Sequence, residues 1–176
     1  MIHNSKILGI DPGYGRVGVA IVEKSTRSEN LLHSECFETD SKLPHFQRLL
    51  LIGEKIKNII KKYKPDQIAV ETLLWSKNKK TALQVAEARG VILLESARAK
   101  IILKEFNPNQ IKVAVTGYGK SDKKQVISMV EKLLKLGQST SGKKRQDDEY
   151  DAIAIALTCS ATHHSTQNIL STEKFI

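Results

Sequence analysis

Two short apolar segments near the N-terminus, separated by a turn, constrain the fold of this chain most. Lys6–Ile10 and Val17–Val22 are rich in Ile and Val, which favour β-strands. The intervening Asp11–Arg16 contains one proline and two glycines, as turns commonly do. Strands joined by so short a turn pair antiparallel, so the chain is expected to begin its sheet with a hairpin. Leu31–Glu38 is predicted as a third strand.

Beyond this hairpin, helical and strand patterns alternate, which is typical of an α/β fold. The predicted helices cover Leu43–Lys62, Lys79–Lys100, Pro108–Val115, Ser121–Leu136 with Ser121 as the N-cap, and Asp147–Thr162; the predicted strands cover Gln67–Thr72 and Ile101–Phe106. The later strands should join the sheet by parallel crossovers, giving a mixed five-stranded sheet flanked by helices. Residues 1–165 are expected to form a single domain, and 166–176 a flexible tail.

The charge of the chain points to a polyanionic partner. Lys and Arg number 28 against 19 for Asp and Glu, giving a formal net charge of +9. Such a balance favours nucleic acid or an acidic membrane surface. Aromatic residues make up only 5%, too few for a protein that stacks single-stranded bases.

Nothing in the sequence suggests export or a membrane span. No segment is apolar enough to cross a bilayer, and the N-terminus has no signal-peptide pattern. Cys36 and Cys159 form no CxxC pair and are expected to be reduced thiols. The expected location is the cytoplasm.

Four acidic residues stand where chemistry is commonly placed. Asp11 and Glu71 end predicted strands, and the ends of strands are where open α/β sheets bind ligands. Asp148 and Asp151 lie three residues apart and share one face of the last helix. Asp11, Asp148 and Asp151 also have a simpler interpretation, since Asp-Pro-Gly is ordinary turn chemistry and acids are common at helix N-termini. Asp147 is an alternative member of the set.

If these four carboxylates converge, they need cations to offset their mutual repulsion. Ligand sets made only of oxygen suit Mg²⁺, with Mn²⁺ as a substitute. Two such ions about 3.5–4 Å apart can activate a water and stabilise the leaving oxygen of a phosphodiester. A basic protein with an acidic metal pocket therefore has the charge distribution expected of a nuclease.

Five motifs, in order along the chain, resemble those of RuvC-type Holliday junction resolvases. They are Asp11-Pro12-Gly13 with Gly18 and Ala20, Glu71 followed by Lys77-Asn78, Ala88-Arg89-Gly90-Val91, the Gly117–Val126 segment, and Asp148-x-x-Asp151-Ala152 with Ala154-Ile155-Ala156. The resemblance extends from about Lys6 to Thr162.

This resemblance implies an RNase H-like fold and a Mg²⁺-dependent homodimer that acts in recombination and DNA repair. Such an enzyme resolves four-way junctions by paired symmetric nicks that leave 5′-phosphate and 3′-hydroxyl ends, and its family implies RuvA and RuvB as partners. Asp11, Glu71, Asp148 and Asp151 take the metal-binding places, with two ions expected per subunit.

The resemblance also implies DNA contacts. Lys112 and Lys123 match two lysines near the scissile phosphate, although solvated surface lysines are the alternative. The family usually has an aromatic wedge where this chain has Leu74, and Trp75 follows directly. Either Trp75 or Leu74 is expected to enter the junction centre, unless Trp75 is a core or dimer-contact residue. Further candidate DNA contacts are Lys77, Lys79, Lys80, Lys120, Ser121 and the basic segment Lys143-Lys144-Arg145.

Several alternatives remain open from sequence alone. A YqgF-type nuclease acting on RNA shares the opening motif but not the Gly117–Val126 segment. An actin-like ATP-binding module needs a second domain for which this chain has no room, and a junction-binding protein without activity should lack one of the four acids. Lys79–Lys100, apolar on several sides, is either the dimer contact or a buried core helix.

Overall fold

The computed structural model describes residues 4–73, 79–136 and 145–162, and it leaves out the side chains of residues 79 and 80. The N-terminal hairpin is as predicted. β1 (Ser5–Asp11) pairs antiparallel with β2 (Arg16–Lys24), which pairs antiparallel with β3 (Glu29–Glu38). Asp11 lies opposite Gly18 at the turn end of this hairpin.

The sheet is mixed and five-stranded, as the sequence predicts. β4 (Gln67–Glu71) pairs parallel with β1, and β5 (Ile102–Phe106) pairs parallel with β4, giving the order β3-β2-β1-β4-β5. β1 and β4 are parallel neighbours, and Asp11 and Glu71 are their last residues. Their side chains therefore start from the same edge of the sheet, where open α/β sheets bind ligands.

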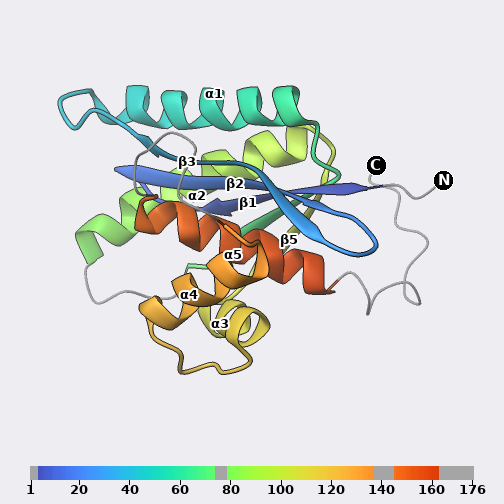
Figure 1. The fold of residues 1–176 in the computed structure, drawn as a ribbon. Helices are drawn as coiled ribbons and strands as arrows, with labels where there is room; N and C mark the ends of the chain where they lie inside the picture. The colour runs from blue at the N-terminus through green and yellow to red at the C-terminus, as the bar shows by residue number, and fades with distance from the viewer. Residues whose placement is uncertain (1–3, 74–78, 137–144, 163–176) are drawn as a thin grey trace.

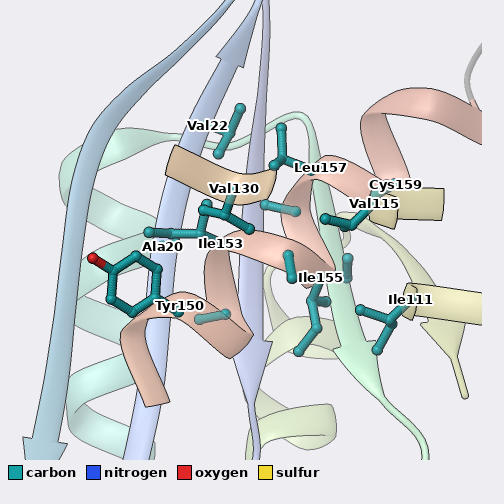
Figure 2. Close-up of a cluster of buried hydrophobic side chains, with 14 of the residues drawn as sticks. Ala20, Val22, Ile111, Val115, Val130, Tyr150, Ile153, Ile155, Leu157 and Cys159 are labelled. Atoms are coloured by element: carbon teal, nitrogen blue, oxygen red, sulfur yellow. The ribbon is translucent and has the colours of Figure 1, made fainter. Parts of the chain in front are cut away.

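Helices cover both faces of this sheet, as Figure 1 shows. α1 (His45–Tyr63) and α2 (Lys79–Arg98) lie side by side on one face, whereas α3 (Pro108–Thr116), α4 (Lys123–Leu133) and α5 (Asp147–Thr162) lie on the other. Each face has its own buried cluster. Figure 2 shows side chains of the α5 cluster, among them Ile111 and Val115 of α3, Val130 of α4 and Ile153 of α5. The α3–α4 pair thus rests on α5.

α5 is the most deeply buried helix, and two glycines let it approach the hairpin. A Cβ atom on Gly9 would lie 2.2 Å from the carbonyl oxygen of Ala152, and one on Gly18 would lie 2.0 Å from that of Asp148. No side chain can occupy such a contact. Because Gly18 is also the partner of Asp11, this contact brings the start of α5 to the end of β1.

Most predicted boundaries agree with the structure to within two residues, and two features of α4 differ. Its N-cap is Asp122, whose side chain accepts a hydrogen bond from the backbone N–H of Gln125 and completes a capping box. Ser121, predicted as the cap, precedes it and is buried. The helix ends at Leu133, before the predicted Leu136, because Leu134 is its C-cap and the next residue, Lys135, is left-handed. The predicted tail lies outside the described residues, and no helix among those described is long and apolar enough to span a membrane.

The close approach of α5 makes Gly9 a test of the fold. Gly9→Ala should lower the free energy of unfolding by roughly 2–4 kcal/mol, because the added methyl group meets backbone atoms on a buried helix. Gly15→Ala is the matched control, since nothing closer than Arg48 Nη2 at 3.8 Å meets its added Cβ. Urea denaturation measures both, and an equal effect of the two substitutions would contradict this account of the packing.

Candidate active site

The four predicted acids come from three elements that meet at one edge of the sheet. Asp11 ends β1, Glu71 ends β4, and Asp148 and Asp151 stand in the first turns of α5. The three-residue spacing places Asp148 and Asp151 on one face of α5. The glycine contacts described above press this end of α5 against the hairpin, so the acids converge.

The electrostatics of Asp11 reflect this convergence. Burial, together with the negative charges of Asp151, Glu71 and Asp148, raises the pKa of Asp11 to about 7. Burial and the charge of Asp151 also raise the pKa of Glu71 to about 7. Carboxyl groups held in this way bind a proton or another cation far more readily than surface carboxyl groups do.

Lys123, in the first turn of α4, supplies the positive charge on the opposite side of a cleft. Its Nζ lies 2.9 Å from Asp151 Oδ2 and 3.5 Å from Asp147 Oδ2. Burial raises the pKa of Asp151 despite the opposing effect of Lys123. The cleft is lined by Glu71, Asp151, Lys112 and Lys123, and its apolar wall is made by Pro108, Ile111, Val126, Ala154 and Ile155.

Asp148 occupies a different environment from Asp151. Its Oδ2 is buried and has no hydrogen-bond partner among the described residues, although Arg16 Nε lies 3.5 Å away. The neighbouring thiol of Cys36 is affected in turn, because burial and the charge of Asp148 raise its pKa to about 11. A buried carboxylate oxygen without a hydrogen bond is costly, and a cation would satisfy it.

This donor set fits a hard divalent cation. All four candidate ligands are carboxylates, as Mg²⁺ prefers, and the Asp148 oxygen that lacks a hydrogen bond could take a coordination position. In the described part of the chain, no three acidic, His or Cys side chains are close enough to hold one ion by themselves. Mg²⁺ does not need such a cage, because it commonly binds one or two carboxylates and completes its shell with water and substrate phosphate.

Two arginines with no predicted role contact the acids, one at a backbone carbonyl group and one at a side chain. Arg89 of α2 donates from Nε to the carbonyl oxygen of Glu71 at 3.2 Å and pairs with Glu105 at 2.8 Å. Arg16 reaches Asp148 from the far end of the Asp11 turn. Arg89 lies within one of the motifs, and Arg16 ends the opening turn, but neither pattern reveals a contact between distant segments.

The predicted DNA contacts divide into three groups. Lys112 and Lys123 line the cleft, and Lys120 is exposed beside it. Ser121 is only 3% exposed, and its hydroxyl group donates to the carbonyl oxygen of Tyr118, so it acts within the α3–α4 corner. Leu74, Trp75, Lys77, Lys143 and Lys144 lie outside the described residues, as do the side chains of Lys79 and Lys80.

Comparison with known proteins identifies the family. The family model described as crossover junction endodeoxyribonuclease RuvC matches residues 7–159, nearly all of the described chain. The chain belongs to the RuvC family. This membership supports the resemblance seen in the five motifs over the YqgF-type and actin-like alternatives.

RuvC proteins also resemble this chain individually. The crossover junction endodeoxyribonuclease RuvC of Thermosipho melanesiensis is 46% identical over 86% of this chain and 94% of its own length. The Thermus thermophilus RuvC structure superposes with a TM-score of 0.80 at 28% identity, covering 91% of this chain and 96% of that chain. T. thermophilus RuvC in complex with Holliday junction substrate has the same TM-score at 26% identity, covering 92% and 96%. The predicted RNase H-like fold is thereby confirmed.

The raised pKa of Asp11 has a consequence for stability without metal. The folded carboxyl group keeps its proton up to about pH 7, whereas the unfolded one loses it near 3.8, so the folded chain binds more protons between these values. The carboxylate therefore destabilises the fold as pH rises through this window. In EDTA, Asp11→Asn should raise the free energy of unfolding by about 1–3 kcal/mol at pH 8 and by little near pH 4.

Urea denaturation across this pH range measures the effect of Asp11→Asn. Glu54→Gln, which replaces an exposed carboxylate of α1, is the control and should follow the wild-type profile. A gain for Asp11→Asn that is the same at pH 5 and pH 8 would show that folding does not raise the pKa of Asp11.

Proposed function

We propose that this chain is a structure-selective endonuclease that resolves Holliday junctions in recombination and DNA repair by paired symmetric nicks. The observation that carries the proposal is the convergence of four carboxylates, two of which line a cleft together with two lysines, in a chain of the RuvC family. A junction-binding protein without activity is disfavoured, because none of the four acids is missing.

The proposed chemistry is phosphodiester hydrolysis with two divalent ions per subunit, Mg²⁺ by preference and Mn²⁺ as a substitute. Asp11, Glu71, Asp148 and Asp151 would hold the ions, which supply an activated water and stabilise charge on the scissile phosphate and the leaving 3′ oxygen. The expected products are a 5′-phosphate and a 3′-hydroxyl, which a ligase can rejoin.

Lys123 and Lys112 have a separate task in this proposal. The ammonium group of Lys123 is held at the cleft by Asp151, and Lys112 lies on its α3 wall. A phosphate entering the cleft offers Lys123 a second anionic partner. Both lysines are thus placed to bind the non-bridging oxygens and stabilise charge that develops there.

Paired cuts require two active sites related by a two-fold axis, so the proposed enzyme is a homodimer. α2 packs one side in the core, and its exposed side is the proposed dimer contact. Ala88 and Ile92 are fully buried in the core, while Leu83 and Leu94 are 65% and 49% exposed on its outer side. Neighbouring α1 exposes Phe46 as well. These large apolar side chains are the proposed contact between two copies.

The remaining proposals follow from the family. Four-way junction DNA is the proposed substrate, and RuvA and RuvB are the proposed partners that bring the branch point to the cut sequence. The relatives named above come from bacteria, whose chromosome lies in the cytoplasm, so this is the proposed place of action. Leu74 or Trp75 remains the proposed wedge at the junction centre.

Cleavage of a labelled synthetic four-way junction tests the proposed activity. With Mg²⁺, the wild-type chain should make paired symmetric nicks, and Asp11→Asn and Asp148→Asn should each lower the rate roughly a thousandfold or more while junction binding persists. Linear duplex and an RNA stem are the controls. Cutting of RNA but not of the junction would support a YqgF-type activity instead.

The dimer contact has its own test. Leu94→Glu places a charge on the exposed side of α2 and should convert the dimer to monomers, because an unpaired charge is costly in an apolar interface. Leu32→Glu, on edge strand β3, is the matched control and should remain dimeric. Sedimentation velocity measures the state. A Leu94→Glu protein that stays dimeric would place the interface elsewhere.

A further inference from the structure

The corner between α3 and α4 presents one exposed aromatic side chain, Tyr118, whose ring is 59% accessible. A single exposed tyrosine is ordinary on a protein surface. Two features distinguish this one, namely the rigidity of its backbone and the charges of its surroundings. Neither the resemblance to the family nor the proposed function gives this residue a role.

The backbone of Tyr118 is fixed by hydrogen bonds to Thr116 and Ser121. Its N–H donates to Thr116 Oγ1 at 3.2 Å, and its carbonyl oxygen accepts from the hydroxyl group of Ser121 at 2.8 Å and from the backbone N–H of Ser121 at 3.2 Å. Ser121 is buried, so its side-chain bond to Tyr118 is partly shielded from water. The side chain is therefore exposed on a backbone that has little freedom.

The glycines on either side reinforce this geometry. Gly117 ends α3 in the left-handed conformation with φ of 76°, which glycine adopts at little cost. Gly119 approaches α3 so closely that a Cβ atom would lie 2.2 Å from Asn109 Oδ1. An aromatic side chain held in place before binding loses little entropy when it meets a partner.

The corner joins the two helices whose lysines line the active-site cleft. Lys112, four residues before Thr116, and Lys123, two residues after Ser121, both line that cleft. Lys120 is exposed within the corner itself. The acid of this segment, Asp122, is engaged as the N-cap of α4. Tyr118 therefore lies exposed on the loop that connects the two helices bearing the cleft lysines, on a surface that DNA bound by both lysines can reach.

We propose that Tyr118 is a DNA-binding residue whose ring packs on deoxyribose sugars of a junction arm, beside the scissile phosphate. This inference rests on the proposed function and names a contact that it does not include. In a duplex arm the bases are stacked inside and the phosphates are bound by lysines. The sugar edges bordering the minor groove are the remaining surface that suits an apolar ring with a polar tip.

Binding of the full chain to a synthetic four-way junction, with Ca²⁺ in place of Mg²⁺, tests the contact. Tyr118→Ala should weaken binding about five- to tenfold, because the ring and its buried surface are lost. Tyr118→Phe, which keeps the ring, should bind within about twofold of the wild type. Leu133→Ala, which truncates an exposed apolar side chain at the other end of α4, is the matched control and should have no effect.

Two further readouts separate a sugar contact from a general loss of affinity. Because tyrosine carries no charge, Tyr118→Ala should leave the salt dependence of binding unchanged, whereas Lys120→Ala should reduce the log–log slope by about 0.9 if it neutralises one phosphate. Hydroxyl-radical footprinting should show that Tyr118→Ala loses protection only at deoxyriboses beside the cut site.

The outcomes for Tyr118 and for the proposed function are distinct. If the wild-type chain cuts the junction but Tyr118→Ala binds within twofold and leaves the footprint intact, only the inference about Tyr118 is overturned. If Tyr118→Phe weakens binding as much as Tyr118→Ala, the hydroxyl group rather than the ring makes the contact, and the packing proposal fails. If the wild-type chain neither binds nor cuts the junction, the proposed function fails first.

Discussion

The close approach of α5 to the β1–β2 hairpin is the contact on which the rest of the structure depends. It requires glycine at positions 9 and 18, because any larger residue would overlap the backbone of α5. It also decides where the acids of α5 lie, since Gly18 is the strand partner of Asp11. The contact between α5 and the hairpin therefore fixes both the packing of the core and the positions of the acids. Moving the acids would require a different core.

The electrostatic cost of this arrangement is concentrated on Asp11. Its carboxyl group is buried beside three others, and Lys123 is the cation that lowers its pKa. Natural proteins tolerate such local destabilisation where function needs it. In the proposed enzyme, the burial and repulsion that raise the pKa of Asp11 would weaken the metal-free fold and favour a bound cation, so stability and function would oppose each other at these residues.

Much of the fold and of the acidic site could be predicted from the sequence, because the patterns that indicate them are local. Strand composition and helical periodicity placed the elements, and the short turn after Asp11 fixed the hairpin. Ser121 was assigned as a cap because it precedes a helix, but Asp122 forms the capping box with Gln125 and leaves Ser121 to the corner. Arg89 and Arg16 were given no role, because their contacts join segments far apart in the chain. Local patterns carry no information on such pairs, nor on the exposure of Tyr118.

The α3–α4 pair has a further consequence, because it rests on α5 rather than on the sheet. The acids belong to strands and to the buried helix, whereas the two cleft lysines belong to this outer pair. Proteins open in cooperative units, and those with fewer buried contacts open first. The α3–α4 pair, which carries the two cleft lysines, is then the unit that opens most readily. The acids remain in place on the strands and on α5. Heat would in that case abolish turnover at temperatures where most of the sheet is still folded, which separates the thermal limit of the enzyme from that of its fold.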